Sequence, residues 1–311
     1  MRLRTLTLSV AALVLAACSQ AEKGADAVTD AASDAAETVT EAVTETVEQV
    51  KATVSLDEAL AMQPDAAKAR YDARNPGKTL AYFGLEPGMT VVEALPGGGW
   101  YSKIMIPVLG DEGTLIGADY SIPMWGKFGG FATEEFLKNK ETWAETWVAD
   151  AKGWPSAENV ELNAFAFGSR PEAIEGTADL VLFVRAFHHL TRFDREFLQE
   201  SLDDVKAVLK PDGIVGIVQH RAPEGNDDGW ANGDNGYVKQ SEVIKIMEAA
   251  GFELAGESEI NANPKDVPTN DDFVWRLPPT LGTSRDNPEL KAEMEAIGES
   301  DRMTLKFKLK S

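Results

Sequence analysis

The chain is organised around a single stretch, Thr90-Val91-Val92-Glu93-Ala94-Leu95-Pro96-Gly97-Gly98-Gly99-Trp100-Tyr101. An apolar run ends on an acid, passes into three glycines and enters a helix-compatible segment up to Leu109, which predicts a strand, a tight turn and a helix. Glycines permit positive φ and let the backbone come close to a ligand, and free N–H groups at a helix start attract negatively polarised groups. The pattern therefore predicts either a ligand-binding turn or a plain tight turn.

Apolar and helical segments alternate along the chain beyond the serine-capped helix start at Ser55. The strands that we predict are Thr90–Leu95, Gly113–Ala118, Val160–Ala166, Asp179–Val184, Gly213–Gln219, Phe252–Ile260 and Met303–Leu309. The helices that we predict are Pro76–Phe83, Tyr101–Leu109, Thr133–Val148, Pro171–Glu175, Arg195–Leu209, Ser241–Ala250 and Pro288–Ile297. This alternation is typical of a doubly wound α/β fold with a mainly parallel sheet.

Length and charge limit what the chain can do. Its 311 residues suit one large domain or two small ones, and its hydrophobic content of 43% suits a globular core. The formal net charge of -21 argues against a nucleic-acid partner, because a phosphate backbone would be repelled. We therefore expect neutral or cationic partners. The single cysteine, Cys18, excludes an intramolecular disulfide and a cysteine-based metal site or nucleophile in the body of the protein.

The N-terminal residues form a pattern typical of export signals. Two arginines and a short apolar segment, Leu6–Leu15, lead into Leu15-Ala16-Ala17-Cys18. This pattern resembles the lipobox of bacterial lipoproteins. The resemblance implies a signal peptide over residues 1–17, lipidation of the Cys18 thiol, a membrane anchor and a periplasmic location, with Ser19 compatible with sorting to the outer membrane of a Gram-negative bacterium. The alternative is an ordinary cleaved signal with an incidental cysteine.

Residues 18–54 have the composition of a stalk. From Ala21 onwards Ala, Thr, Glu, Asp and Val dominate, and apolar residues such as Val39, Val43 and Val47 recur at gaps of three and four, which is helical periodicity. Weak apolar residues and unpaired acids make an isolated helix marginal. We expect a partly helical or disordered acidic spacer, with a self-associating helix as the alternative, and a globular domain over residues 55–311.

Several short motifs occur in an order that resembles a known enzyme family. Glu93 precedes the glycines, Asp119 closes the second predicted strand, and Asp179 opens the fourth. Leu209-Lys210-Pro211-Asp212-Gly213 precedes the fifth, and Ala249-Ala250-Gly251-Phe252 precedes the sixth. This order resembles class I S-adenosylmethionine-dependent methyltransferases. The resemblance implies a Rossmann-like, seven-stranded sheet, mostly parallel with an antiparallel last strand, and S-adenosylmethionine as the cofactor.

Four further motifs are similar to a branch of uncharacterised, predicted bacterial methyltransferases. They are Pro87-Gly88, Pro96-Gly97-Gly98-Gly99-Trp100-Tyr101, Val184-Arg185-Ala186-Phe187-His188 and His220-Arg221-Ala222. With the family motifs, the resemblance covers the chain from about Asp72 to Lys310.

The resemblance implies a cofactor site at the ends of the first three strands. Glu93 would accept hydrogen bonds from the cofactor or counter its cationic end, and Gly97–Gly99 would admit its amino-acid portion. Asp119 would accept the ribose hydroxyls, and Phe165 would flank the adenine. The alternatives are a helix cap or turn acid for Asp119 and core packing for Phe165. Leu95 departs from the family at large, which has its first glycine at this position.

His188, His189 and His220 are the only histidines, and all lie at predicted carboxyl ends of neighbouring strands, where doubly wound folds bind ligands. Each is a candidate general base for a hydroxyl or amine acceptor, and hydrogen bonding to the scaffold is the alternative. Arg185 is a candidate contact for an anionic group in the cofactor site, or the buried partner of an acid such as Glu93. We expect no metal site, because the nearby acids lack a recognised ligand spacing.

Aromatic side chains are candidates for the acceptor pocket, namely Tyr101, Trp125 and Tyr237. Trp125 lies in the aromatic, glycine-punctuated segment Ser121–Phe131, which predicts either a lid over the acceptor or core packing. For Trp143 and Trp147, one helical turn apart, we favour core packing of an inserted helix.

The sequence thus predicts an exported, lipid-anchored enzyme that transfers a methyl group to a small acceptor. The alternative is a non-catalytic small-molecule-binding lipoprotein on the same fold, because S-adenosylmethionine is made in the cytosol. A nicotinamide-dependent oxidoreductase shares the strand, turn and helix, but Glu93 precedes the glycines and no G-x-G-x-x-G motif follows.

Overall fold

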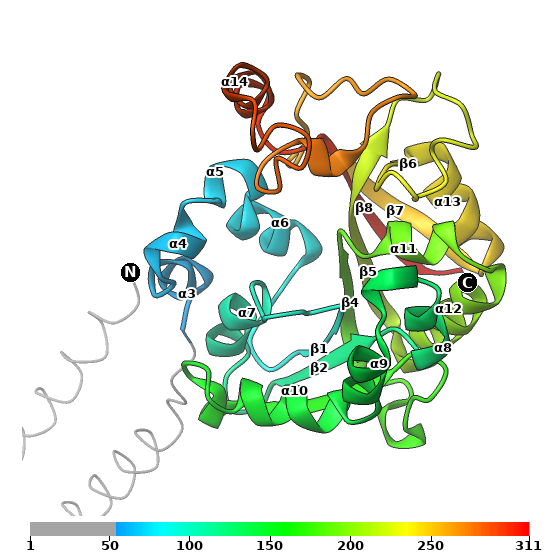
Figure 1. The fold of residues 1–311 in the computed structure, drawn as a ribbon. Helices are drawn as coiled ribbons and strands as arrows, with labels where there is room; N and C mark the ends of the chain where they lie inside the picture. Colours follow the sequence, from blue (N-terminus) through cyan, green and yellow to red (C-terminus); the bar gives the residue numbers. More distant parts are fainter. Residues whose placement is uncertain (1–53, 311) are drawn as a thin grey trace, which may run out of the picture. The chain divides into compact units, whose positions relative to one another are not determined.

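The computed structural model describes residues 54–310, so the predicted signal peptide, Cys18 and nearly all of the predicted stalk lie outside the described residues (Figure 1). The strands are β1 (Thr90–Ala94), β2 (Thr114–Asp119), β3 (Glu161–Ala166), β4 (Ala178–Val184), β5 (Leu209–Ala222), β6 (Val238–Lys239), β7 (Phe252–Ser258) and β8 (Arg302–Leu309). The helices are α3 (Leu56–Ala61), α4 (Asp65–Lys68), α5 (Tyr71–Arg74), α6 (Pro76–Phe83), α7 (Ser102–Leu109), α8 (Ile122–Gly126), α9 (Glu134–Glu141), α10 (Trp143–Ala151), α11 (Phe187–Arg192), α12 (Arg195–Val208), α13 (Gln240–Ala249) and α14 (Pro288–Ile297). Within residues 54–310, none of these helices is long and apolar enough to cross a membrane.

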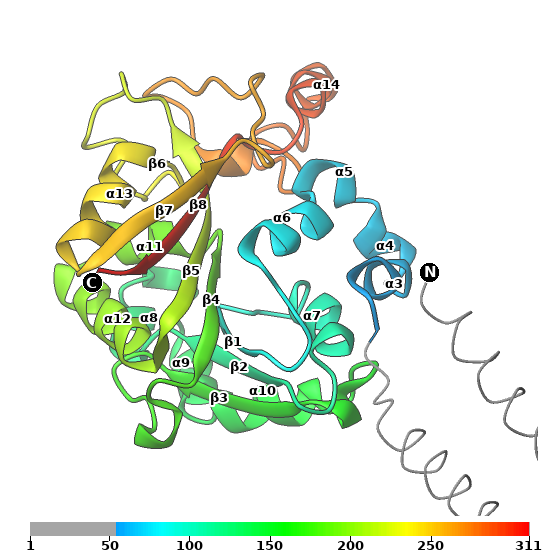
Figure 2. The same cartoon turned by 180° about the vertical axis from the view of Figure 1, so that it is seen from behind.

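One sheet runs through the middle of this part of the chain (Figures 1 and 2). Its strand order is β3-β2-β1-β4-β5-β8-β7, and the short β6 pairs with the end of β5. Neighbouring strands from β3 to β5 are parallel, whereas β8 runs antiparallel to both β5 and β7. The predicted doubly wound, Rossmann-like fold with an antiparallel last strand is therefore confirmed.

The strand order reverses between β1 and β4. The chain goes outward from β1 through β2 to β3 and then returns to the other side of β1 with β4. In open α/β sheets the loops that leave the carboxyl ends of such a strand pair diverge, and ligands bind in the crevice between them. The glycine turn follows β1 and the histidine segment follows β4, so both lie at this switch point.

Alternate side chains of the central strands pack into two apolar layers, one on each face of the sheet. Val92 and Ile116 belong to the layer that includes residues of α8, α12 and α13, whereas Val91 and Leu115 belong to the layer that includes residues of α3, α6 and α7. This two-sided burial explains the nearly continuous apolar runs of the parallel strands. The same alternation sends the Glu93 side chain, with those of Val91 and Leu115, toward α7.

Several helices begin or end at the residues that the sequence predicts. Ser55 and Glu58 form a capping box at the start of α3, and α6 ends at Gly84 with φ 83°. Asn75 precedes α6 as predicted, but its side chain donates to the Ile260 carbonyl oxygen (2.9 Å) instead of capping the helix.

Two predicted helices differ from the structure. Pro171–Glu175 is only a short 3-10 turn, Glu172–Ile174. Thr133–Val148 is two helices, α9 and α10, separated at Thr142, whose backbone leaves the helical region (φ -111°, ψ 15°). The two helices make different contacts. From α10, Trp147 packs on β2 at Gly117, where an added Cβ would lie 3.1 Å from its ring. The core-packing interpretation of Trp147 is thereby confirmed.

Candidate functional site

The glycine turn after β1 has a left-handed backbone at three positions. Leu95, Gly97 and Gly99 have φ values of 54°, 53° and 75°. The left-handed conformation is unfavourable for a leucine by about 1–2 kcal/mol, so Leu95 retains the backbone geometry of a glycine without being one. The Leu95 N–H donates to the Ala118 carbonyl oxygen at 2.7 Å, which ties the turn to the end of β2. Strain of this kind is concentrated at functional sites.

One side of the turn is closed and the other is open. A Cβ on Gly99 would lie 2.3 Å from the Trp154 ring, whereas a Cβ on Gly97 or Gly98 would meet no atom within 4 Å. On the closed side, the Lys103 ammonium donates to the Gly98 carbonyl oxygen (2.9 Å) and lies 4.7 Å from the Trp154 ring centre. The open backbone at Gly97 and Gly98 can therefore be approached closely by a ligand.

Glu93 is a buried carboxyl group without a cationic partner among residues 54–310. Its side chain accepts a 2.5 Å hydrogen bond from the Ser102 hydroxyl, and the residue is 4% exposed. Burial raises the pKa of Glu93 to about 7, against the opposing effect of the Ser102 hydrogen bonds. A strongly perturbed carboxyl beside an open turn at the switch point is typical of functional sites.

Asp119 lies at the end of β2, as predicted, but it is already engaged. Its carboxylate accepts a 2.6 Å ion-pair contact from Lys140 of α9 and a 2.9 Å hydrogen bond from the Tyr120 N–H. Lys140 in turn lies 4.2 Å from the centre of the Trp125 ring. Asp119 is 2% exposed, so these side chains cover the carboxylate that the sequence assigns to a sugar.

The remaining residues of the predicted adenine and acceptor contacts are mostly core residues. Phe165 packs edge-to-face on Phe167 and is 4% exposed, which is the core-packing alternative. Trp125 packs against Tyr120 and Phe128 and is 6% exposed, so the segment that follows β2 forms an aromatic layer above the sheet edge.

His188 is held in one tautomer by Gln219. The Gln219 amide nitrogen donates to the Gly236 carbonyl oxygen (2.8 Å), which turns its amide oxygen toward His188. That oxygen accepts from the His188 backbone N–H (3.1 Å) and lies 3.2 Å from its Nδ1. Nδ1 must therefore carry the proton and Nε2 the lone pair. Nε2 is buried and has no hydrogen-bond partner within residues 54–310.

All three histidines form one group at the ends of β4 and β5. The ring centre of His188 lies 3.9 Å from that of His189 and 5.7 Å from that of His220. His220 Nδ1 lies 2.6 Å from the Ser300 hydroxyl oxygen. Burial lowers the pKa of His188 and His220 far below 6.5 and that of His189 to about 4, so all three imidazoles are neutral at pH 7. The predicted clustering of the histidines is thus observed.

Tyr237 lies behind His220 and does not line open space. Its residue is fully buried, its ring centre lies 6.2 Å from that of His220, and its hydroxyl donates to Asp266 (2.9 Å). The loop that leads to it packs on α11, because a Cβ on Gly233 would lie 2.2 Å from the His188 carbonyl oxygen. Tyr237 is corrected from a pocket residue to a support for the histidine group.

Arginines lie next to the end of the glycine turn, at Trp100 and Tyr101. Arg74 lies 5.1 Å from the Trp100 ring centre, and its carbonyl oxygen is 3.5 Å from the Tyr101 hydroxyl. Burial raises the pKa of Tyr101 to about 12, while the positive charges of Arg185, Arg302 and Arg74 act in the opposite direction. Tyr101 therefore lies next to the predicted Arg185 and to two arginines that the sequence did not single out.

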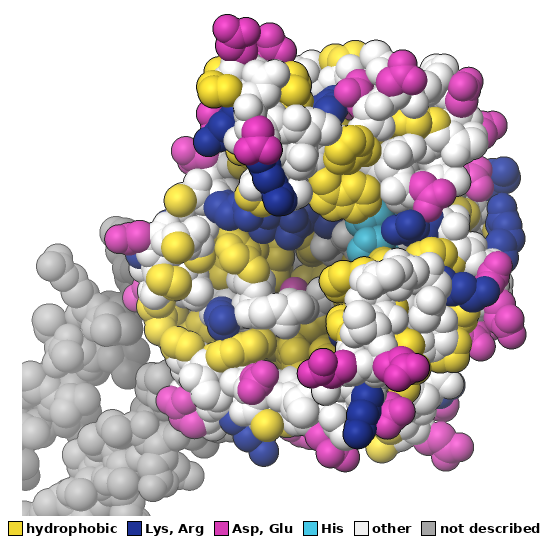
Figure 3. Space-filling model, viewed as in Figure 1, with side chains coloured by type: hydrophobic (Ala, Val, Ile, Leu, Met, Phe, Trp, Pro, Cys, Tyr) yellow, Lys and Arg dark blue, Asp and Glu magenta, His cyan; other side chains and the backbone are white. Residues whose placement is uncertain are grey.

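A hollow opens in this face of the molecule (Figure 3). Lysine or arginine side chains form a band along one wall, the histidines appear beside that band, and hydrophobic side chains make up much of the remainder. Lysine or arginine side chains and the histidines thus lie together at one hollow.

Several residues of the site have no clear local signal in the sequence. Gln219 is the best marked, because it is a polar residue at the end of the apolar run of β5. Ser102, Lys140, Ser300 and Arg302 come from elements that only the fold brings together.

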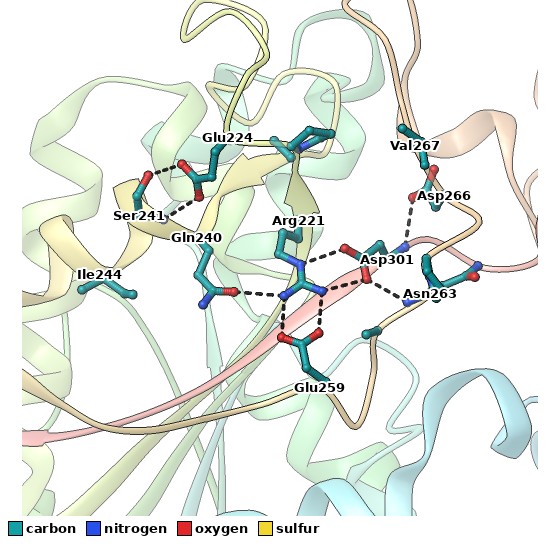
Figure 4. A pocket seen from close by; sticks show the side chains of 14 residues that line it. Arg221, Glu224, Gln240, Ser241, Ile244, Glu259, Asn263, Asp266, Val267 and Asp301 are labelled. Atoms are coloured by element: carbon teal, nitrogen blue, oxygen red, sulfur yellow. Dashed lines mark hydrogen bonds and ion pairs between the residues drawn. The ribbon is translucent and has the colours of Figure 1, made fainter.

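A second cavity, of about 750 Å³, lies at the carboxyl end of β5, beyond His220 (Figure 4). Its polar groups are satisfied by one another. Arg221 binds Asp301 (2.8 Å) and Glu259 (2.7 Å) and donates to the Gln240 side chain (3.2 Å). The Arg221 of the sequence motif is therefore a structural residue, and we assign no ligand to this cavity.

No protein-family model matches the chain, and no curated protein matches it either. Among solved structures, it is similar to an S-adenosylmethionine-dependent methyltransferase from Aquifex aeolicus, with 21% identity over 64% of this chain and 94% of that chain and a TM-score of 0.42. It is also similar to the cyclase SpnF (12% identity, 76% and 81% covered, TM-score 0.49). A third is the Burkholderia thailandensis 1,6-didemethyltoxoflavin-N1-methyltransferase (12% identity, 94% and 93% covered, TM-score 0.41). These likenesses are distant, and the strand order of the sheet is what defines the fold.

Proposed function

We propose that the protein transfers a methyl group from S-adenosylmethionine to a small acceptor. The observation that carries this proposal is Glu93, a buried carboxyl with a pKa raised to about 7, beside the open backbone of Gly97 and Gly98. A buried carboxyl of this kind favours a ligand that brings a positive charge or several donors. S-adenosylmethionine carries both an ammonium and a sulfonium group, and its amino-acid portion is slim enough for a glycine turn.

The residues present fit most of this cofactor. Glu93 would receive its donors, and the backbone of Gly97 and Gly98 would lie against its amino-acid portion. When bound, the cofactor supplies a methyl group that its sulfonium already activates. The chain then has to position the acceptor and accept a proton, and His188 Nε2 is an oriented lone pair for that task.

A second candidate is a non-catalytic small-molecule-binding protein. The observation that favours it is the Asp119–Lys140 ion pair under Trp125, because a ribose would contact Asp119 only if these side chains moved. A different ligand, held by Glu93 and the arginines alone, would leave that pair intact.

We expect the purified protein to bind S-adenosylhomocysteine in isothermal titration calorimetry and to convert S-adenosylmethionine to S-adenosylhomocysteine when a suitable acceptor is added. Mass spectrometry of any small molecule that stays bound through purification separates the two candidates. Absence of binding by both S-adenosylmethionine and S-adenosylhomocysteine would reject the methyltransferase, and a different co-purifying compound would support the second candidate.

We further propose that Cys18 carries the lipid that anchors the protein on the periplasmic side of the membrane. The support is the sequence Leu15-Ala16-Ala17-Cys18 after the apolar segment. We expect Cys18→Ala to move the protein from the membrane fraction to the soluble fraction of the host cell, because the thiol that takes the lipid is gone. Cys18→Ala protein that stays fully in the membrane fraction would contradict the anchor.

A further inference from the structure

Four arginines lie close to one another, and we call Arg70, Arg74, Arg185 and Arg302 the arginine cluster. One acid, Glu299, pairs with three of them, with an Arg74 Nε distance of 3.1 Å and shorter contacts to Arg70 and Arg302. Arg74 and Arg302 are 5% and 2% exposed. One carboxylate thus faces several buried or half-buried guanidinium groups, in a protein whose net charge is -21.

Arg185 is the member of the cluster without a partner. Its side chain makes no hydrogen bond or ion pair with any residue in the range 54–310, although it is partly buried. A guanidinium has five donors and no acceptor, so leaving them unpaired away from water is unfavourable. Burial lowers the pKa of Arg185 to about 9, and the nearby charges of Arg74 and Arg302 act in the same direction, against the opposing charge of Glu299.

The backbone at Arg185 is strained as well. Its φ is 60°, and its N–H donates to the Val218 carbonyl oxygen at 2.7 Å, as Leu95 does to Ala118 at the end of β1. A non-glycine residue in the left-handed region directs its side chain differently from a normal strand residue. An unpaired charge and a strained backbone at one residue lower stability, which is the usual signature of a residue kept for binding.

The cluster joins the two halves of the site. On one side it reaches the glycine turn, since Arg74 lies over Trp100 (5.1 Å from the ring centre). On the other side it reaches the histidines, because Arg302 pairs in register with His220 across β5 and β8. Arg302 Nε also donates to the Ser300 hydroxyl (3.2 Å), which lies 2.6 Å from His220 Nδ1.

We propose that the molecule methylated at this site is an anion, whose carboxylate or phosphate group is held by Arg185 with the charges of Arg74 and Arg302 behind it. This inference rests on the proposed function. A planar guanidinium fork matches carboxylate and phosphate oxygens in pairs, and the local excess of positive charge offsets the negative field of the whole protein. Arg185 belongs to the segment that carries the histidines, so an anion bound there lies on the acceptor side of the glycine turn.

Arg185→Met tests the proposal, with inorganic phosphate and succinate as probes at constant ionic strength. We expect both probes to raise the unfolding temperature of the wild-type protein, because a ligand that binds the folded state stabilises it. Arg185→Met should weaken the apparent affinity at least about tenfold, since a charge-assisted pair of hydrogen bonds is lost. The matched control is Arg285→Met, which removes an exposed arginine and should leave the response to both probes unchanged.

The ligand-free variant gives a second readout that a folding defect cannot imitate. Arg185→Met removes a charge repelled by Arg74 and Arg302, so its unfolding temperature without probes should equal or exceed that of the wild type. The proposal is overturned if neither probe has an effect, or if Arg185→Met keeps the full effect.

Saturating S-adenosylhomocysteine distinguishes the acceptor from the cofactor's own carboxylate. If the anion belongs to the acceptor, the effect of phosphate and succinate persists when S-adenosylhomocysteine is bound. Loss of the effect would assign Arg185 to the cofactor and overturn the proposal. Failure of S-adenosylhomocysteine to bind at all is a different result, because it rejects the proposed methyl transfer while the response to phosphate still reports the anion site.

Discussion

Replacing Glu93 with glutamine is expected to make the protein more stable at pH 8 and, at the same time, to weaken S-adenosylhomocysteine binding by about ten- to a hundredfold. The first effect arises because the wild-type carboxylate is buried with a single hydroxyl donor from Ser102 at 2.5 Å. The second arises because a neutral amide loses the charge that holds cationic or donor groups of the ligand.

The pH dependence fixes the sign of the stability effect. The unfolded chain has a glutamate pKa of 4.5, whereas burial raises the folded value for Glu93 to about 7. Between these values the folded state binds more protons, so stability falls as the pH rises through this window. The full penalty above pH 7 is about 3 kcal/mol at about 1.4 kcal/mol per pKa unit. Glu93→Gln removes this penalty, but the burial of its amide N–H groups is itself unfavourable. The net gain in the free energy of unfolding should be roughly 2 kcal/mol at pH 8 and close to zero at pH 5.

Urea unfolding at pH 5 and pH 8 measures the gain, and calorimetry measures the affinity. The matched control is Glu145→Gln on α10, where the glutamate is exposed, and it should change neither quantity. Calorimetry in two buffers of different ionisation enthalpy adds a direct test, because ligand binding that lowers the pKa of Glu93 releases protons near pH 6.5. A Glu93→Gln protein that binds S-adenosylhomocysteine with wild-type affinity would remove Glu93 from the cofactor site.

The positions of Glu93, Asp119 and the histidines were predictable because they depend on local pattern. An apolar run has to end somewhere, and in a parallel sheet all such ends meet at one edge. The turn after β1 keeps its geometry even without a glycine at its first position, because Leu95 adopts a left-handed backbone with a φ of 54°. The geometry of the turn is set by the backbone hydrogen bond to Ala118 at 2.7 Å and therefore survives the substitution.

Ion pairs between residues that are far apart in the sequence could not be predicted from it. Asp119 at the end of β2 and Lys140 of α9 are 21 residues apart in the sequence and pair at 2.6 Å only in the folded chain. The arginine cluster is still less visible, because Arg74 and Arg302 come from opposite ends of the domain and meet at Glu299. A net charge of -21 averages over the whole chain and favours neutral or cationic partners, yet the hollow itself is locally cationic.

His188 should be the histidine whose loss most reduces turnover. We expect His188→Ala to lower the formation of S-adenosylhomocysteine from S-adenosylmethionine, assayed with a panel of small carboxylic acids, by about 10²- to 10⁴-fold, the range for a general base. The affinity for S-adenosylhomocysteine should stay within about threefold of the wild type, because His188 belongs to the acceptor side. His189→Ala is the control on the same helix, with a smaller expected loss, since its Nδ1 is 3.3 Å from Tyr120 and serves the aromatic layer. Equal turnover by His188→Ala and wild type would contradict the assignment.

The tautomer of His188 can be observed without any acceptor. Nitrogen NMR of the labelled protein should show His188 protonated at Nδ1 and unprotonated at Nε2 from pH 8 down to pH 5.5, because burial and the charges of Arg192 and Arg185 hold its pKa far below 6.5. Gln219→Leu should produce a mixture of the two tautomers, since the oxygen that accepts from Nδ1 is gone.

The low pKa of His188 makes its imidazole a weak base in the free protein. An anion at Arg185 offsets the neighbouring positive charges, so adding phosphate or succinate should raise the pKa of His188. The arginine cluster would then both hold the acceptor and restore the basicity of the group that deprotonates it, and an unchanged His188 titration with phosphate bound would break that link.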